Sequence, residues 1–358
     1  MSKVIVGMSG GVDSAVAAYL LKEQGYEVIG VTLRTWEGSN GEESRCCEID
    51  DARDIARRIG IEYHAFNCIA DFESKVIEPF IDDYLKGLTP NPCVVCNREI
   101  KWARMLYYAD VLRADFVATG HYASVVKTED GRYTVTKARH GEKDQTYMLY
   151  RLTQEDLART LMPLGEYSKS EVRAIAERAS LGVASKPDSQ EICFVPDDDH
   201  VGFIERHARR EIPGQGNFVD EDGKILGTHR GIIHYTVGQR RRLGIALGQR
   251  AYVKKISPET GEIVIGNADG IFCRTLICRD LNFMSIPPLR AGESVRCTVK
   301  VRYRHPGQSA TLEMIGDDLV RVSFDEPVRS AAPGQSAVFY DDADRVVGGG
   351  VISEVTFD

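Results

Sequence analysis

A short apolar run followed at once by a glycine-rich loop opens the chain and limits the folds it can adopt. Residues 3–6, KVIV, have the composition of a buried strand, and the loop GMSGGVDS (7–14) follows without a break. Apolar residues then recur at helical spacing from Val12 to Tyr19, and Gly25 ends the predicted helix. A strand, a tight glycine loop and a helix in this order indicate an α/β protein with an anion site at the helix N-terminus.

Strands and helices continue to alternate beyond this first unit. Apolar runs of strand length and helical patterns occur in turn at residues 26–33, 51–60, 61–67, 72–86 and 114–123. Strands that alternate with helices predict a parallel, doubly wound sheet. We therefore expect an α/β domain over residues 1–205.

The pattern changes after this domain. Residues 206–275 carry many glycines and short apolar runs, which indicate a small mixed domain, and 251–266 is predicted to form two strands joined by a turn. Residues 276–358 contain short strands between Gly and Pro turns, typical of a small barrel or sandwich. Within them 294–304 alternates strictly, so Tyr303 is expected on the apolar face of one strand.

Composition excludes some classes of protein. The chain has 358 residues, 27% of them charged, and no apolar run approaches the ~20 residues that a membrane helix needs. The N-terminal apolar run is too short for a signal peptide, so we expect a cytoplasmic protein without a membrane partner. Nine cysteines in a chain this long are not a secreted disulfide framework. The net charge of −8 weakens a nucleic-acid partner without excluding one, because the distribution of charge matters more.

The loop at 7–14 has two interpretations. It lacks the Gly-Lys-Ser/Thr ending of a Walker A loop and the spacing of a dinucleotide-binding loop. It could be a plain turn in which Asp13 caps the helix. Alternatively it is an ATP site, in which glycine N–H groups approach the phosphates while the hydroxyls of Ser9 and Ser14 donate to them.

Three cysteines stand in distinctive surroundings. Cys93 and Cys96 lie in NPCVVCNR (91–98), and Cys193 lies in DSQEICFV (188–195). A structural zinc site needs a fourth ligand, usually from a second Cys-x-x-Cys or a His pair, and the sequence contains no convincing pair of this kind. A thioredoxin-like motif is disfavoured because the pair follows a helix and a Pro-containing loop instead of opening a helix after a strand. Inert buried thiols fit poorly with the polar flanking residues.

Several motifs together resemble a known family. SGGVDS (9–14) resembles the PP-loop of ATP pyrophosphatases. In chain order, NPCVVCNREIKW, ATGHYA, KDQTYML, DSQEICFV, YTVGQRRRLGI and VRYR are similar to the tRNA-specific 2-thiouridylases over nearly the whole chain. The resemblance implies a PP-loop (adenine nucleotide α-hydrolase-like) domain, a small central domain and a C-terminal antiparallel β-barrel. It also implies ATP-dependent 2-thiolation of the wobble uridine, position 34, in the anticodon stem-loop of tRNA.

The resemblance also assigns roles to individual residues. Cys193 would carry a persulfide, and Cys96 would act on it, releasing sulfide or closing a Cys96–Cys193 disulfide. Asp13 would lie near Mg²⁺ and the pyrophosphate of ATP, and Arg98 or Lys101 would favour a thiolate. The implied ATP-binding residues are Gly7, Met8, Ser9, Gly10, Gly11, Val12, Asp13, Ser14, Leu33 and Gly120. The implied tRNA-binding residues are Asn91, Pro92, Cys93, His121, Lys143, Asp144, Gln145, Arg302, Tyr303 and Gln335.

Cys93 is where the chain departs from part of the family, because some members carry aspartate at this position. One alternative is that Cys93, Cys96 and Cys193 hold three corners of a [4Fe–4S] cluster; otherwise no metal site is expected. The sulfur would come from a sulfur-relay protein or a cysteine desulfurase. The run RRR (240–242) and the basic residues near Arg302 are candidate phosphate contacts.

Overall fold

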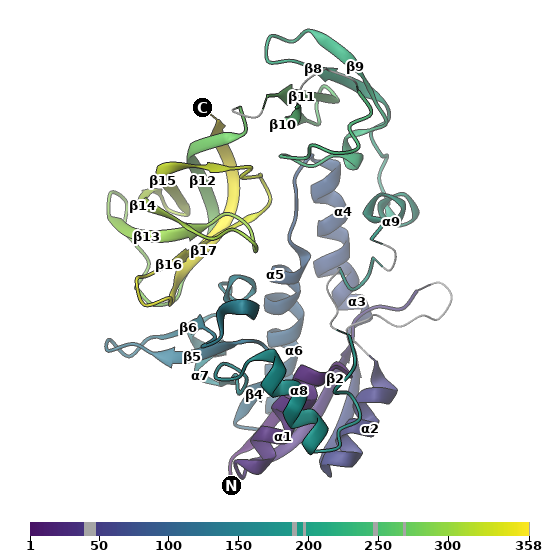
Figure 1. Ribbon diagram of the computed structural model, residues 1–358, viewed down its shortest axis with the longest axis vertical. Helices are drawn as coiled ribbons and strands as arrows, with labels where there is room; N and C mark the ends of the chain where they lie inside the picture. The colour runs from purple at the N-terminus through teal and green to yellow at the C-terminus, as the bar shows by residue number, and fades with distance from the viewer. Residues whose placement is uncertain (39–47, 188–191, 196–197, 246–249, 268–269, 358) are drawn as a thin grey trace. The chain divides into compact units, whose positions relative to one another are not determined.

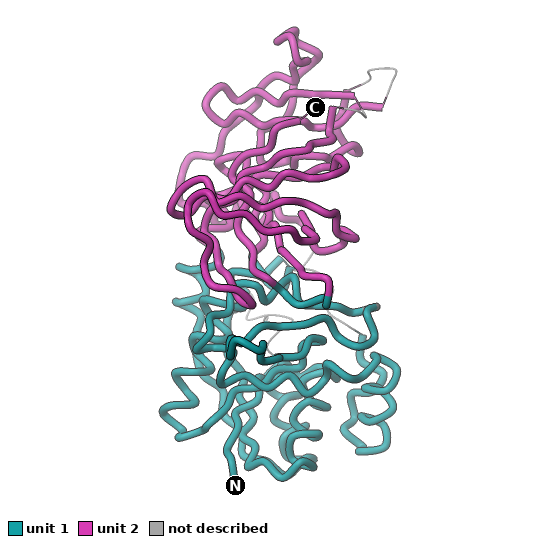
Figure 2. Tube along the Cα trace, turned by 90° about the vertical axis from the view of Figure 1, so that its left-hand side faces the viewer, with its two compact units in different colours: residues 1–77, 92–198, 343–346 teal, residues 78–91, 199–342, 347–358 magenta. Residues whose placement is uncertain are grey.

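The computed structural model describes residues 1–38, 48–187, 192–195, 198–245, 250–267 and 270–357. The chain divides into two compact units, each made of separate stretches (Figure 2). The first holds residues 1–77, 92–198 and 343–346, and the second holds 78–91, 199–342 and 347–358. The domain boundaries predicted at residues 205 and 275 stay predictions. No helix in the described part of the chain is long and apolar enough to cross a membrane.

A parallel sheet forms the centre of the first unit, as the alternation of strands and helices predicts. Its strand order is β3-β2-β1-β4-β7, and neighbouring strands pair in parallel. The strands are β1 (Lys3–Gly7), β2 (Glu27–Arg34), β3 (Glu62–Asn67), β4 (Phe116–Ala118) and β7 (Thr160–Leu161).

Helices cover both faces of this sheet. They include α1 (Val12–Glu23), α2 (Ile49–Ile59), α6 (Ala103–Val111) and α8 (Lys169–Arg178). Val4 and Val6 of β1 join a core that also takes residues from α1, α2 and α8. A Cβ on Gly7 would lie 3.1 Å from the sulfur of Met105 in α6. Because alternate residues of a strand point to opposite faces, α6 lies on the other side of the sheet. The predicted doubly wound arrangement is confirmed (Figure 1).

Two helical stretches contain π-helical segments. One runs through α3 (Ile69–Phe72), η1 (Glu73–Ile77) and α4 (Glu78–Leu85). The other runs through α5 (Pro92–Cys96) and η2 (Asn97–Trp102) into α6. Cys93 and Cys96 therefore lie in the first turns of a helix, which follows α4 and a Pro-containing stretch as the sequence indicates. The remaining elements of the first unit are the hairpin β5 (Ala123–Lys127) and β6 (Tyr133–Lys137), η3 (Gly141–Lys143), η4 (Thr146–Met148) and α7 (Gln154–Ala158).

The second unit begins with a small mixed sheet of order β10-β11-β8-β9. Its strands are β8 (Gly216–Val219), β9 (Ile225–His229), β10 (Tyr252–Ser257) and β11 (Glu262–Gly266), and α9 (His200–His207) and η5 (Ile232–His234) belong to the same unit. The antiparallel pair β10–β11 confirms the two strands predicted within 251–266.

A closed barrel completes the second unit, with strand order β12-β15-β14-β13-β16-β17. The strands are β12 (Phe272–Phe283), β13 (Ser294–Lys300), β14 (Gln308–Gly316), β15 (Leu319–Arg329), β16 (Ser336–Tyr340) and β17 (Val346–Phe357). The prediction of one strand over 294–304 is wrong at its end. β13 stops at Lys300, and Tyr303 lies in the following turn with 38% of its surface exposed, not on an apolar strand face.

Candidate active site

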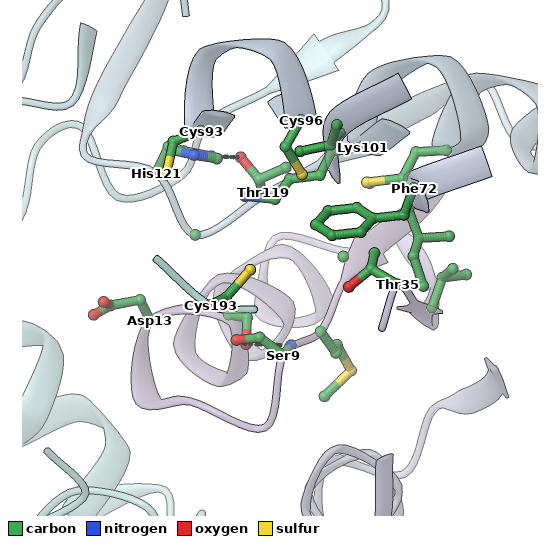
Figure 3. Close-up of a pocket in the computed structure, with 18 of the residues that line it drawn as sticks. Ser9, Asp13, Thr35, Phe72, Cys93, Cys96, Lys101, Thr119, His121 and Cys193 are labelled. Atoms are coloured by element: carbon green, nitrogen blue, oxygen red, sulfur yellow. Dashed lines mark hydrogen bonds between the residues drawn. The ribbon is translucent and has the colours of Figure 1, made fainter. Parts of the chain in front are cut away.

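A cavity of about 260 Å³ lies in the first unit, beside the carboxyl end of β1. It brings together residues from seven separate stretches of the sequence: 7–14, 31–35, 72–76, 92–105, 119–121, 145 and 192–194 (Figure 3). The predicted site residues that line it are Gly7, Met8, Ser9, Asp13, Ser14, Leu33, Pro92, Cys93, Cys96, Gly120, His121, Gln145 and Cys193. Gly10, Gly11 and Val12 belong to the same loop and α1 but are not among the lining residues.

The glycine loop leaves the first N–H groups of α1 without a side-chain cap. Gly11 is the N-cap residue and has no side chain to accept from them. Gly10 has φ +79°, a left-handed conformation that glycine adopts without strain. Inside the loop, the Ser14 hydroxyl donates to Gly11 O at 3.1 Å and accepts from Ser9 N–H at 3.2 Å. The loop therefore presents uncapped N–H donors, an arrangement suited to an anion.

Gly120 lies directly against this loop. A Cβ at this position would be 2.7 Å from both Asp13 C and Ser14 N. Those are backbone atoms, which cannot move aside without shifting the start of α1. The segment after β4 therefore approaches the loop closely because residue 120 has no side chain.

Asp13 does not cap α1, so the plain-turn interpretation of its side chain is wrong. Its Oδ1 accepts a hydrogen bond from the Tyr122 hydroxyl at 2.7 Å and from Lys169 Nζ at 2.6 Å. Burial and the neighbouring Asp13 carboxylate raise the pKa of the Tyr122 phenol well above its usual range, which keeps this group a donor. Burial lowers the pKa of Lys169, while its bond to Asp13 opposes that shift. The carboxylate is thus fixed at the edge of the cavity.

Two of the three distinctive cysteines point into the cavity from different segments, Cys96 from α5 and Cys193 from the loop after α8 (Figure 3). Cys96 is buried, Cys193 is partly buried and Cys93 is exposed. Since residues three apart in a helix share a face, Cys93 lines the same cavity as Cys96. The structure therefore places three thiols and the glycine loop around one space.

The two cations that were expected to favour a thiolate have different positions. Lys101 lines the cavity. Arg98 pairs with Asp156 at 2.8 Å instead, and Asp156 also forms the capping box of α7 with Thr153. Lys101 is therefore the better placed of the two to act on the cysteines.

His121 lines the cavity next to the cysteines as a neutral ring. Its Nδ1 is 2.7 Å from the Thr119 hydroxyl, a bond visible in Figure 3. Burial, and secondarily the charge of Lys101, lowers the pKa of His121 to about 3. The imidazole is uncharged near neutral pH and can contact a base only as a neutral donor or acceptor.

One wall of the cavity is apolar. It contains side chains from β2, α3, η1 and α6: Val31, Leu33, Phe72, Val76 and Met105. Such an apolar wall beside the glycine loop has the character of a pocket for a flat heterocycle.

The three residues at 143–145, which are predicted to contact tRNA, have different positions in the structure. Gln145 lines the cavity, and its Oε1 accepts from Tyr122 N–H at 2.9 Å. Asp144 instead accepts from the backbone N–H and the hydroxyl of Thr146, so it closes a local turn. Lys143 is not among the lining residues.

The remaining predicted tRNA contacts belong to the second unit: Asn91, Arg302, Tyr303 and Gln335. Gln335 donates from Nε2 to Thr89 O at 2.9 Å, two residues before Asn91. Gly334 approaches the same segment, because its Cβ would lie 2.9 Å from Thr89 N. Gln335 therefore holds the stretch that leads to Asn91.

Sequence reasoning missed two residues that act on Asp13. Tyr122 stands within the quoted motif ATGHYA but received no role. Lys169 follows the helix-start pattern Ser168-x-x-Glu171, which forms a capping box in the structure. That pattern places Lys169 in the first turn of α8, but its distance from Asp13 comes only from the tertiary fold.

In the described residues, no group of three or more Cys, His, Asp or Glu side chains is arranged to hold a metal ion. Cys93, Cys96 and Cys193 line one cavity without forming such a group. The [4Fe–4S] alternative stays a prediction, because thiols that ligate four irons lie farther apart than the ligands of a single ion.

Comparison with known proteins identifies the family. Residues 2–197 match the family model described as the tRNA methyl transferase HUP domain, 202–267 the tRNA methyl transferase PRC-barrel domain, and 273–352 the aminomethyltransferase beta-barrel domain.

Relatives of known name are similar over almost their full length. The tRNA-specific 2-thiouridylase MnmA of Lachnoclostridium phytofermentans is 50% identical and covers 98% of this chain and 99% of its own. The MnmA of Clostridioides difficile is 47% identical, with 98% of each chain covered. Among solved structures, the U34-tRNA thiolase NcsA of Methanococcus maripaludis covers 53% of this chain and 60% of its own. Its TM-score of 0.36 and 23% identity are too low to support an inference. On the strength of the near full-length relatives, the chain belongs to the tRNA-specific 2-thiouridylase family.

Proposed function

We propose that this chain thiolates C2 of the wobble uridine, position 34, of tRNA, using ATP to activate the base and a cysteine persulfide to supply sulfur. One observation carries the proposal: the phosphate-type loop at 7–14 and three thiols line a single cavity. A ligase that joins small molecules needs the loop but no set of thiols. The words methyl transferase in the family-model description account for neither feature.

The first step makes the uracil oxygen a leaving group. The C2 oxygen attacks the α-phosphorus of ATP, the α–β bond breaks, and pyrophosphate leaves with its electron pair. The N–H groups at the start of α1, together with Ser9, would bind the phosphates. Val31, Leu33 and Phe72 would bind the adenine. Asp13 would hold Mg²⁺, whose charge offsets that of the pyrophosphate, and Lys169 keeps that carboxylate in place.

The second step transfers sulfur. The terminal sulfur of a persulfide on Cys193 attacks C2, and the C2–O bond breaks to release AMP. The Cys96 thiolate then attacks the Sγ of Cys193, forming a Cys96–Cys193 disulfide, and the electron pair of the broken S–S bond stays on the 2-thiouridine. Alternatively, Cys96 attacks first and releases sulfide as the nucleophile. In either route a thiol reductant restores the two cysteines.

The base must leave the anticodon stack to reach this cavity. Pro92, Cys93 and His121 would border the extruded uracil, with His121 as a neutral hydrogen-bonding partner. Asn91, Lys143, Asp144, Arg302, Tyr303 and Gln335 are proposed as tRNA contacts outside the cavity. The sulfur donor would be a sulfur-relay protein or a cysteine desulfurase.

The test uses the purified chain with ATP, Mg²⁺, an unmodified tRNA transcript and a persulfide donor. We expect AMP and pyrophosphate to form only when tRNA is present, and digestion followed by mass spectrometry to find 2-thiouridine at position 34. Formation of a methylated nucleoside instead, or ATP cleavage that is independent of tRNA, would contradict the proposal.

Iron analysis tests the cluster alternative separately. We expect chain purified without oxygen to contain far less than one iron per molecule and to thiolate tRNA in the presence of an iron chelator. A brown protein with about four irons would support the [4Fe–4S] role of the three cysteines and contradict the persulfide route.

A further inference from the structure

Three arginines in the second unit, Arg240, Arg302 and Arg329, combine exposure with contacts to one another or to a shared tyrosine. Elsewhere arginines commonly pair with carboxylates, as Arg321 does with Glu313 at 2.8 Å. Arg240, Arg302 and Arg329 are exposed, and none has a carboxylate at ion-pair distance in the described part of the chain. In a chain of net charge −8, a group of uncompensated cations is a specific feature of this surface.

Two of these arginines lie beside one buried tyrosine, and the third bonds to the backbone of Arg329. The guanidinium of Arg329 lies over the ring of Tyr252, 5.0 Å from its centroid. Arg240 lies near the phenol of Tyr252 and is the first cause of the lowered pKa of that group. Arg302 donates from Nη1 to Arg329 O at 3.4 Å. We refer to Arg240, Arg302, Arg329 and Tyr252 as the arginine cluster.

The backbone beneath the arginine cluster is tightly fixed. Gly238 has φ +85°, and a Cβ there would lie 2.7 Å from the Cβ of Ser330, the residue after Arg329. Gly238 N donates to Val253 O at 2.8 Å, and Val253 N donates to Gln239 O at 2.9 Å. Arg240 and Arg329 are therefore attached to segments that are already packed together, so binding a ligand costs little ordering.

Titratable groups nearby respond to the positive charge. Arg240 and Arg329 hold the pKa of the Tyr252 phenol below its usual value. The pKa of His305 is lowered to about 4, first by burial and then by Arg302 and Lys300. His305 is therefore neutral at physiological pH, and the local charge comes from groups that do not titrate there.

We propose that the arginine cluster is a phosphate-binding site for the sugar-phosphate backbone of RNA. Guanidinium groups present paired N–H donors that match phosphate oxygens, and their charge does not depend on pH near neutrality. The inference rests on the proposed function for the identity of the RNA as tRNA. It assigns binding roles to Arg240, Arg329 and Tyr252, and it gives Arg302 a structural context.

Salt dependence of RNA binding tests this site without catalysis. Fluorescence anisotropy of a labelled tRNA transcript, without ATP, gives Kd at several NaCl concentrations for the wild type and for the R240Q/R329Q double variant. Each lost phosphate contact should reduce the slope of log K against log salt by about 0.9. A change of about 0.9 in this slope makes the association constant of the variant about 8-fold lower than that of the wild type at 0.1 M salt, if the two constants are equal at 1 M.

R321Q is the matched control, because it removes one arginine of the same barrel that already has a carboxylate partner. It should leave the slope within error of the wild type. R329K keeps the positive charge but loses the paired N–H donors of the planar guanidinium. It should therefore keep the slope of log K against log salt while weakening tRNA binding. If thermal melting shows that the double variant does not fold, the single variant R240Q, at an exposed residue, replaces it.

The outcomes separate this inference from the proposed function. If the wild type binds no tRNA, the proposed function fails. If the wild type binds with a steep salt slope but R240Q/R329Q behaves like R321Q, the arginine cluster is only a solvated surface and the inference fails. If ATP displaces tRNA from the arginine cluster as strongly as unlabelled RNA does at equal phosphate concentration, the cluster binds phosphate groups of any kind. The assignment to the RNA backbone is then overturned.

Discussion

The Asp13 carboxylate accepts hydrogen bonds from the Tyr122 phenol and the Lys169 ammonium, and the proposed nucleotide binding depends on its position. We expect K169Q to leave Asp13 less firmly placed and to remove a positive charge beside the loop. A displaced catalytic group commonly costs ~10²-fold in rate, so kcat/KM for ATP should fall by about that factor.

K169R provides the control for that prediction, since it keeps the charge and can still reach Asp13. Pyrophosphate release at varied ATP concentration measures both variants. Equal kcat/KM in K169Q and the wild type would show that Lys169 has no role in the ATP site.

His121 gives a pH-dependent prediction of stability. Its pKa in the folded chain, about 3, lies below the value of about 6.5 for an unfolded histidine. The unfolded chain therefore binds this proton first, and His121 destabilises the fold progressively as pH falls below 6.5. The contribution is at most about 2 kcal/mol at pH 5.

H121Q removes that titration while its amide can still bond to Thr119. The difference in Tm, variant minus wild type, should therefore increase as the pH is lowered from 7 to 5. Parallel Tm curves for the two chains across this range would contradict the low pKa.

At the scale of elements, the meeting of α1 with the segment after β4 decides the shape of the site. We expect G120A to push a methyl group into the backbone of Asp13 and Ser14 and to cost about 1–3 kcal/mol in stability. The KM for ATP should rise at the same time, because the loop moves.

G141A is a matched control for G120A, since a Cβ on Gly141 meets nothing within 4 Å. Thermal melting and pyrophosphate release measure both variants. Similar behaviour of G120A and G141A would mean that the loop tolerates a side chain at residue 120.

The sequence predicts elements better than it predicts their ends. Alternating apolar runs were enough for the parallel sheet and for the β10–β11 pair. The helix start at Pro92 was missed although proline is common at the first helical position. The strand over 294–304 was extended too far, because the alternation of Val301 and Tyr303 continues into a turn. The pairing of Lys169 with Asp13 joins residues 156 positions apart, so no local pattern could reveal it.

At the scale of the whole molecule, the chain passes between its two units several times. The stretch 78–91 belongs to the second unit, where Tyr84 stacks on His200 at 4.9 Å and Thr89 N donates to Pro333 O at 2.9 Å. The linear pattern gave no sign of this, because the helix that carries Tyr84 continues without a break from the first unit.

A chain cut after residue 198 should therefore fold poorly. It would keep α4 but lose the residues that bury Phe80, Ile81 and Tyr84. We expect this fragment to bind a hydrophobic dye and to melt below the full chain or without cooperativity. A soluble fragment with a sharp transition at the temperature of the full chain would show that the first unit is independent of the second.

The most direct test of the central claim separates activation of the base from sulfur transfer. C193S is compared with the wild type under single-turnover conditions with ATP, Mg²⁺, tRNA and a persulfide donor. The buried Cys68, which is not among the residues that line the cavity, supplies the control C68A. We predict that C193S still releases tRNA-dependent pyrophosphate but forms no 2-thiouridine, whereas C68A does both. Thiolation by C193S at the rate of the wild type would contradict the assignment of Cys193 as the sulfur carrier.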